Sequence, residues 1–301
     1  MKQIEKYFGF IFLATLALAL FLPWGTTVFK PYVVPALMLM MFFSFIKIDI
    51  KEVVENIKKP FLISFLCLFY LFLIPVAVYY TFTLISPTLG IGLALLAAAP
   101  PAIASPALTN IVKGNTALSL TVTFITHLLA PFSIVIVFYL LTATTLELDF
   151  VSILKSLLII ILIPLVISQI IKPYIKDFVK KTQHTYTAIT ILLIVIIVYS
   201  VLRDQKDLIL SNPLENLVIV LWLYVLHIAT HIIGYFLPFW RKRDEKISSS
   251  VMATYKNAIL VLVIAYKFFS PEIALIIVLS EIPFATLLAP FRYVLKIVKK
   301  V

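Results

Sequence analysis

The chain has 301 residues, of which 62% are hydrophobic and 13% are charged, and its mean hydropathy is +1.11. Soluble domains are about half apolar and about one quarter charged, so this composition excludes an ordinary soluble enzyme or binding domain. Because Cys67 is the single cysteine, a disulfide framework and a cysteine metal site are excluded as well.

Ten apolar runs follow one another along the chain, and each is long enough to cross about 30 Å of hydrocarbon. The first resembles a signal peptide, but Tyr32 opens another apolar run where a polar mature chain would begin. The pattern predicts an all-α polytopic protein with ten transmembrane helices in a lipid bilayer. The runs span residues 8–24, 31–48, 60–85, 89–111, 116–142, 150–171, 184–202, 214–239, 248–266 and 273–295.

The lysine and arginine residues are distributed between alternate loops as the positive-inside rule requires. With the N-terminus in the cytoplasm, nineteen of these 25 residues fall on the inner side and five on the outer side, and Lys256 lies within a run. We expect a multi-pass protein of the plasma membrane with both termini in the cytoplasm. The net charge of +11 is then a topology signal, and nucleic acid is not an expected partner.

Two pairs of short segments recur at a similar offset. HLLAPF (127–132) corresponds to TLLAPF (286–291), and IDIK (48–51) corresponds to RDQK (203–206). The pattern predicts one transporter domain over residues 1–301, built from a first five-helix repeat (1–145) and a second (146–301). Since five spans is an odd number, the two repeats have opposite orientations, which is typical of secondary transporters.

The fourth and ninth runs occupy equivalent places in the two repeats, and both are irregular. The fourth contains Pro100, Pro101 and Pro106, and proline breaks or kinks a helix. The ninth contains Thr254 and the pair Lys256 and Asn257. Interrupted spans in corresponding positions indicate the binding site of a transporter.

Two stretches resemble the bile acid:sodium symporter family. ASPALTNIVKGNTALSLTVTFITHLLAP (104–131) is similar to the family's fourth and fifth helices, with the Ala-Ser, Gly-Asn and Ala-Leu-Ser-(x)3-Thr pattern. KNAILVLVIAYKFFSPEIAL (256–275) resembles its ninth helix. The resemblance implies ten helices in two inverted repeats. Helices 1, 2, 6 and 7 form a panel, the others form a core, and helices 4 and 9 unwind and cross at the midplane.

The resemblance also implies roles for individual residues. Ser105 matches a sodium-binding serine on the fourth helix, and Ser119 and Thr123 match sodium ligands on the fifth. Asn257 matches an asparagine that faces the substrate at the crossover of the ninth helix.

Three departures from the family pattern affect the sodium sites. Pro106 replaces an asparagine, Met252 replaces a sodium-binding glutamate, and Lys256 replaces a sodium-binding glutamine. Both sodium sites are therefore altered. No cofactor is expected, and sodium binding is an open question.

Lys256 has three interpretations, because a lysine at the centre of a membrane helix costs roughly 3 kcal/mol on insertion scales and is usually functional. Its ammonium can replace sodium as a fixed charge that donates hydrogen bonds to unwound carbonyls. It can instead carry a proton through the transport cycle. A purely structural lysine would form a fixed internal pair, for which Glu281 in the tenth run is the candidate partner.

Ser119, Thr123 and either Thr126 or His127 recur at helical spacing and give the fifth run one polar face. Hydroxyls in membrane helices often bond only to the carbonyl four residues earlier. A position facing the broken fourth helix nevertheless favours a role in the site. His127 is a candidate accessory group of the site that could respond to pH, but packing is the role we expect for it.

His227 and His231, in the sequence HIATH, lie one turn apart in the eighth run. A metal site needs more ligands, and no carboxylate or cysteine lies at similar depth in this run. Hydrogen bonds between helices are therefore the expected role of both histidines.

These features predict a secondary transporter, not an enzyme, that moves a small organic anion by alternating access. Converging helix N-termini and Lys256 favour the anion, and either a proton or sodium can be the coupling ion. The alternatives are a conventional sodium-coupled symporter and an auxin-efflux-type or arsenite permease. A different class, a membrane enzyme or receptor, would bind metal through His227 and His231. No nucleotide-binding motif supports direct coupling to ATP.

Overall fold

The computed structural model describes residues 11, 14–21, 26–57, 60–142 and 147–297. In these ranges the regular structure is helical, and the β-type contact is an isolated bridge between Pro101 and Lys256. The all-α prediction is confirmed. Of the first predicted run, only residues 11 and 14–21 belong to the described ranges, and both parts are helical.

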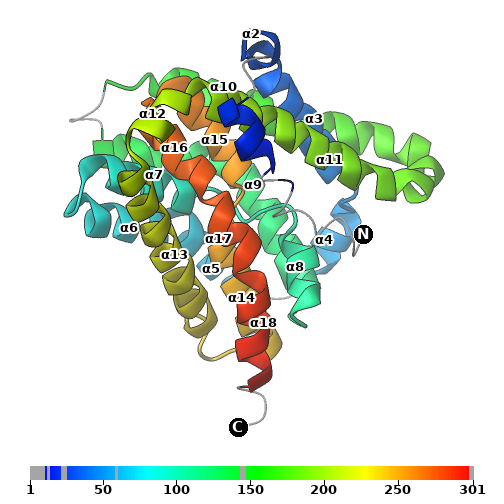
Figure 1. Ribbon diagram of the computed structural model, residues 1–301. Coiled ribbons are helices and arrows are strands. Elements are labelled where there is room, and N and C mark those ends of the chain that lie inside the picture. Colours follow the sequence, from blue (N-terminus) through cyan, green and yellow to red (C-terminus); the bar gives the residue numbers. More distant parts are fainter. Residues whose placement is uncertain (1–10, 12–13, 22–25, 58–59, 143–146, 298–301) are drawn as a thin grey trace.

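The first part of the chain forms helices of very different lengths (Figure 1). The third predicted run is continuous but contains a π-helical turn, η2, and the fourth is divided into α7 and α8. The elements are α2 (Thr26–Phe29), η1 (Lys30–Tyr32), α3 (Val33–Phe45), α4 (Ile50–Glu55), α5 (Pro60–Leu68), η2 (Phe69–Leu73), α6 (Ile74–Thr83), α7 (Pro87–Ala98), α8 (Ser105–Ile111) and α9 (Thr116–Thr142).

In the second part, the ninth run is divided into α14 and α15, and the tenth is divided into three helices. The elements are α10 (Phe150–Ile171), η3 (Lys172–Ile175), α11 (Lys176–Asp204), α12 (Lys206–Ser211), α13 (Pro213–Phe236), α14 (Arg243–Thr254), α15 (Ala258–Phe268), α16 (Pro271–Leu279), α17 (Glu281–Thr286) and α18 (Leu288–Ile297). Pro87, Pro213 and Pro271 stand in the first turns of their helices, where the missing N–H has no intrahelical partner to lose.

Four segments are long and apolar enough to cross a membrane: Pro60–Thr83, Thr116–Thr142, Phe150–Val179 and Pro213–Phe236. A fifth results if Pro271–Thr286 and Leu288–Ile297, bent by 41°, are counted as one span. Large apolar side chains are exposed along the helices, Phe61, Leu84 and Leu140 among them. Such a surface fits lipid better than water. The protein is therefore a multi-pass helical membrane protein, while the arrangement as ten spans in two repeats stays a prediction.

The helices pack in two groups that α15 connects. α3 packs against α10 and α11, which lie in the upper part of Figure 1. In the other group α13 packs against α14, α6 packs against α7, and α7 packs against α16. Because α15 contacts α3, α10 and α11 as well as α7 and α16, the break that precedes it lies where the two groups meet.

Two polar contacts join segments that the predicted topology places on the same side. Lys30 pairs with Asp204 at 2.9 Å, and both belong to loops predicted to lie outside. At the other end, the Arg243 guanidinium donates to the carbonyl of Leu295 at 2.6 Å. The contacts agree with the predicted alternation of loops, and the assignment of one end to the cytoplasm stays a prediction.

Candidate functional site

Two helices are interrupted where the sequence predicts breaks. Residues 99–104 separate α7 from α8, and residues 255–257 separate α14 from α15. Pro100 and Pro101 explain the first break, because proline lacks a backbone N–H and its ring clashes with the preceding turn. Both predicted breaks are confirmed.

The two unwound segments pair with each other through their backbones. The N–H of Ala102 donates to the carbonyl of Tyr255 at 2.7 Å, and the N–H of Asn257 donates to the carbonyl of Pro100 at 2.8 Å. Unwound backbone at membrane depth is tolerated only where protein or a water-filled cavity satisfies it. The crossing of the two broken helices, in the fourth and ninth predicted runs, is therefore held by main-chain hydrogen bonds.

Lys256 lies in this crossing and is 5% exposed. In the part of the chain that the structure describes, its Nζ has no hydrogen-bonding partner. The ammonium lies over the ring of Tyr70, 5.2 Å from the ring centroid. The hydrogen bonds to unwound carbonyls that the fixed-charge interpretation of Lys256 invokes are therefore not formed among the described residues. The charge has a ring face beside it but no counter-ion among the described residues.

Tyr70 brings the third span to the site, although the sequence suggested no ligand there. It belongs to the π-helical turn η2, and such turns occur frequently at functional sites. Its hydroxyl donates to the carbonyl of Ser249 at 3.0 Å and lies 2.8 Å from the Ser249 hydroxyl. This link between η2 and α14 fixes the ring over which the ammonium lies.

Three hydroxyl groups near the crossing are, like the ammonium of Lys256, buried without a hydrogen-bonding partner among the described residues. Ser119, Thr123 and Thr254 are buried, and none of their hydroxyl groups has a hydrogen-bonding partner among the described residues. Leaving a buried polar group unpaired costs about 1–3 kcal/mol. Unpaired polar groups that gather at one place therefore indicate a site for a polar ligand. By contrast, the Thr126 hydroxyl donates to the carbonyl of Val122 at 2.7 Å, as a packing residue does.

The register of α9 places both of its unpaired hydroxyls beside the crossing. Asn115 contacts Ser248 on α14 at one end, and His127 contacts Asn257 at the other. The twelve positions from Asn115 to His127 cover about 18 Å of helix. From Ser248 to Asn257 the chain advances six residues along α14 and then three residues of extended backbone, which together cover about 19 Å. The stretch of α9 between these two contacts therefore runs alongside α14 and the break, and both hydroxyls lie on this stretch.

Asn257 is held by His127, which makes that histidine more than a packing residue. His127 Nδ1 lies 2.8 Å from the carbonyl of Thr123, so it is the protonated nitrogen, and Nε2 accepts from the Asn257 amide at 3.0 Å. The Asn257 side-chain oxygen accepts from the N–H of Leu260 at 3.3 Å and caps α15. The accessory position predicted for His127 is adjacent to the site.

The other predicted residues on the fourth and tenth spans lie differently. Ser105 is fully buried, and its hydroxyl donates to the carbonyl of Tyr255 at 3.4 Å across the crossing. Pro106 stands in the first turn of α8, so it helps to start this helix and does not extend the break. Glu281 is buried at the start of α17. No ion pair or hydrogen bond joins it to Lys256 in the described ranges, so the fixed internal pair of the structural interpretation is not formed there.

The comparisons with known proteins agree with this geometry. The model of the SBF-like CPA transporter family matches residues 6–281. The chain belongs to this family. The resemblance to bile acid:sodium symporters is thereby confirmed, and the protein is a secondary transporter. No curated protein matches the chain.

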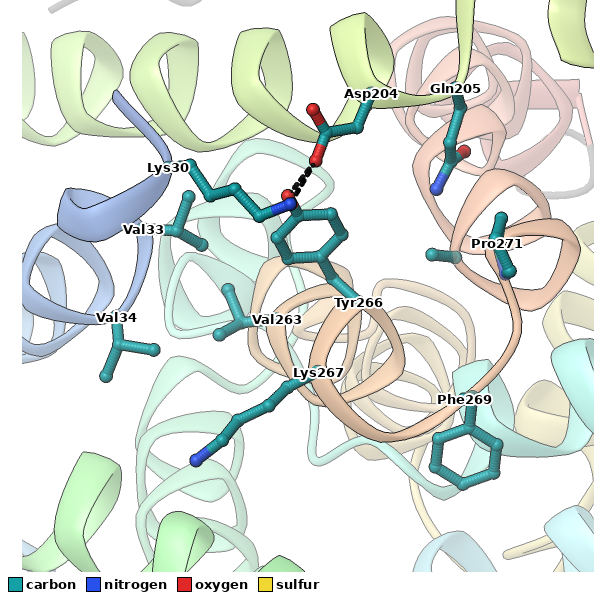
Figure 2. Close-up of a pocket in the computed structure, with 11 residues that line it drawn as sticks. Lys30, Val33, Val34, Asp204, Gln205, Val263, Tyr266, Lys267, Phe269 and Pro271 are labelled. Atoms are coloured by element: carbon teal, nitrogen blue, oxygen red, sulfur yellow. Dashed lines mark hydrogen bonds and ion pairs between the residues drawn. The ribbon is translucent and has the colours of Figure 1, made fainter. Parts of the chain in front are cut away.

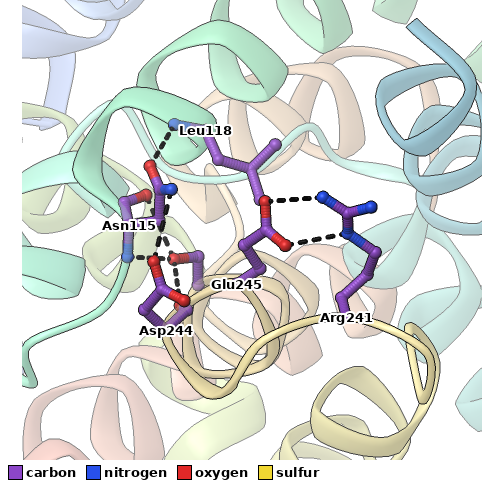
Figure 3. A network of polar contacts seen from close by, with 6 residues as sticks. Asn115, Leu118, Arg241, Asp244 and Glu245 are labelled. Carbon is purple, nitrogen blue, oxygen red and sulfur yellow. Dashed lines mark hydrogen bonds and ion pairs between the residues drawn. The ribbon is translucent and has the colours of Figure 1, made fainter. Parts of the chain in front are cut away.

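In this SBF-like transporter, a polar network ties the start of α9 to α14 (Figure 3). The Asn115 side chain caps α9 by accepting from the N–H of Leu118 at 2.9 Å. The backbone N–H of Asn115 donates to the Ser248 hydroxyl at 2.6 Å, and its amide donates to Asp244 at 3.4 Å. The network explains the asparagine of the Gly-Asn pattern, because it sets the register of α9 along the site. The sequence marked the pattern without indicating this partner.

An ion pair lies next to this network. Glu245 on α14 is 1% exposed, and its carboxylate accepts two hydrogen bonds from Arg241, at 2.8 and 3.2 Å (Figure 3). A bidentate pair of this kind is among the stronger ion pairs in proteins. It anchors the first turn of the helix that leads to the crossing.

The two histidines of the HIATH sequence have partners of their own. His227 Nδ1 bonds to the carbonyl of Leu223 within α13 at 2.8 Å. His231 joins α13 to α14, because its Nδ1 lies 2.9 Å from the Ser250 hydroxyl, which donates in turn to the His231 carbonyl at 2.8 Å. The expected bond between helices is formed by His231 and not by His227. The described residues contain no cluster of three or more metal-ligating side chains.

Proposed function

We propose that this transporter carries a small organic anion by alternating access and that the anionic group of the solute pairs with the ammonium of Lys256. The single observation that carries the proposal is the buried ammonium at the crossing of the two broken helices, which has no counter-ion in the part of the chain that the structure describes. In our proposal the protein lies in the plasma membrane with both termini in the cytoplasm.

The electrostatics of the crossing favour a negative solute. An unpaired charge inside protein is costly, and an opposite charge removes most of the penalty. Asn257 caps the N-terminus of α15 at the same place, and this helix N-terminus adds a partial positive charge. A carboxylate placed there would meet both fields, whereas a cation would be repelled by the same groups.

The hydroxyls of Ser119, Thr123 and Thr254 suit the rest of the solute or its water. Each is a donor and an acceptor without a partner among the described residues. Ser105, Lys256 and Asn257 are all at most 6% exposed, so the site is closed to solvent. Entry and exit of a solute therefore require the helix groups to move, as alternating access demands.

The same groups support transport without sodium. In the symporters that this chain resembles, sodium ligands occupy the positions of Met252 and Lys256. A thioether is a poor sodium ligand, and an ammonium repels a cation. We propose that the lysine supplies the positive charge that sodium supplies in those relatives. Whether Lys256 keeps its proton during the cycle decides between uniport of the anion and proton coupling.

We expect sodium to leave the stability of the purified protein unchanged. The measurement is the unfolding temperature in sodium chloride and in choline chloride at equal ionic strength, because a ligand that binds only the folded state raises this temperature. The double variant Met252→Glu/Lys256→Gln restores both ligand types and should gain a saturable rise with sodium. A saturable rise in the unaltered protein would instead establish a conventional sodium symporter.

Substitutions at Asn257 separate the cap from the binding of the solute. Asn257→Ala removes the side-chain cap of α15 and should lower the free energy of unfolding by about 1 kcal/mol. Asn257→Asp keeps a capping oxygen but replaces the amide that donates to His127 by a carboxylate. This negative charge, at the residue next to Lys256 in the chain, would compete with an anionic solute. We expect this variant to fold and to lose transport in proteoliposomes. Normal transport by Asn257→Asp would contradict pairing of the solute with Lys256.

A further inference from the structure

A cavity separate from the crossing lies at the end of the molecule that carries Lys30 (Figure 2). Its volume is about 670 Å³, within the range of small-molecule sites. It is lined by residues of η1, α3, the end of α11, α15 and the start of α16. None of the residues that form the crossing belongs to its lining. Val263, which lines it, lies about 9 Å farther along α15 than Asn257.

Gln205 gives this cavity an unsatisfied recognition group. The residue is 3% exposed, and neither its Nε2 nor its Oε1 has a hydrogen-bonding partner among the described residues. Figure 2 shows its amide pointing from the end of α11 into the ring of lining residues. A buried primary amide offers donors and an acceptor side by side. Its complement is a ligand that accepts one hydrogen bond and donates another from neighbouring atoms.

The charged residues of the lining select the sign of that ligand. Lys30 and Lys267 contribute two ammonium groups, and Asp204 contributes one carboxylate. The carboxylate is already occupied, because it accepts from Lys30 at 2.9 Å and from the Tyr266 hydroxyl. Lys267 donates to the neutral Ser156 hydroxyl at 3.1 Å. The lining therefore has an excess positive charge, which favours an anion.

The apolar residues of the lining determine which kind of hydrocarbon group the ligand carries. Val33, Val34, Val263, Phe269 and Pro271 supply branched and aromatic apolar surface. A compact branched hydrocarbon buries well against such a wall, whereas a strongly hydrated anion such as a small inorganic ion does not.

We propose that this cavity binds a 2-hydroxy acid with a branched apolar side chain. The carboxylate would accept from Gln205 Nε2 within the positive field, the neighbouring hydroxyl would donate to Oε1, and the side chain would lie on the apolar wall. Binding of the acid in this cavity is independent of the proposed function. Only its later passage through the crossing rests on the proposed function.

The test is calorimetric titration of the purified full-length protein with four probes. 2-Hydroxy-4-methylpentanoate should bind most tightly. 4-Methylpentanoate lacks the hydroxyl, 2-hydroxy-4-methylpentanamide lacks the charge, and lactate lacks the apolar body, so each should bind more weakly. Gln205→Leu, which has a similar volume, should weaken the full acid about tenfold or more. Lys267→Gln should weaken the two 4-methylpentanoates and leave the uncharged amide unaffected.

Lys256→Met separates this inference from the proposed function. Binding that is lost in Gln205→Leu and kept in Lys256→Met would establish the cavity, whatever the transport assays give. Binding that is kept in Gln205→Leu and lost in Lys256→Met would overturn the cavity and place the acid at the crossing. Equal affinity for all four probes, or no binding of 2-hydroxy-4-methylpentanoate to the unaltered protein, would also overturn the proposal.

Discussion

Lys256→Met should make the protein more stable and abolish transport. Methionine fills nearly the same space as the lysine stem and removes a charge that has no counter-ion among the described residues. Replacing an unpaired buried charge by a shape-matched apolar group should raise the free energy of unfolding by on the order of 2 kcal/mol. The ring of Tyr70, 5.2 Å from Nζ, would then contact a thioether, which packs favourably on aromatic rings.

The two measurements are the unfolding temperature of the purified variant and solute counterflow in proteoliposomes, with the anion that the unaltered protein carries. Lys51→Met is the matched control, because Lys51 is exposed on α4 and far from the crossing in sequence. It should change neither quantity. A less stable Lys256→Met variant would mean that the ammonium holds the crossing together, and unimpaired counterflow would remove Lys256 from the transport site.

An increase in stability with a loss of function is the usual sign of a group retained for activity. The backbone bonds of the crossing make this outcome the expected one. Ala102 and Asn257 each donate a main-chain hydrogen bond across the two breaks, so the crossing does not need the ammonium for its geometry. The charge is then available for a solute.

The sequence located the crossing because its causes are local. Pro100 and Pro101 break a helix wherever they stand, and Lys256 with Asn257 interrupts an apolar run in any context. The polar face of α9 was equally visible, since Ser119, Thr123 and His127 repeat at helical spacing. Each of these features is determined by residues a few positions apart in the chain, so a single sequence is enough to predict it.

The partners of these residues were not predictable in the same way. Asn257 bonds to His127 across 130 residues. Lys256 lies over the ring of Tyr70, which belongs to the third predicted run, where the sequence suggested no ligand. Glu281 was the candidate partner of Lys256 because its carboxylate lies within the adjacent tenth run, but the two side chains form no hydrogen bond in the described ranges. Such contacts depend on how the helices pack and rotate, and the periodicity of one helix does not contain this information.

Gly234 is a further example, because one glycine in an apolar helix gives no signal of its own. A Cβ at this position would lie 2.7 Å from the Cβ of Ala253, 2.8 Å from the Cα of Ser250 and 2.9 Å from the carbonyl oxygen of Ser249. Two of these three atoms are backbone, which cannot turn away as a side chain can. The glycine therefore allows α13 and α14 to approach closely.

Gly234→Ala should lower the free energy of unfolding by about 2 kcal/mol, because overpacking forces the backbone to move. It should also weaken transport, since α14 carries Ser249, which holds Tyr70, and ends at the crossing. The unfolding temperature and counterflow measure the two effects. Gly92→Ala is the matched control: its three nearest atoms all belong to the Ile276 side chain, with Cδ1 at 2.8 Å, and none of them is backbone.

The double variant Gly234→Ala/Ala253→Gly tests the mechanism within the same helix pair. It removes the closest of the three atoms. The double variant should therefore be more stable than the sum of the two single changes in the free energy of unfolding predicts, as coupled neighbours are. Recovery should be incomplete, because the two backbone contacts remain. If Gly234→Ala were as stable as the unaltered protein, α14 would have room to shift. The close packing of α13 on α14 would then not be what positions Tyr70 and the crossing.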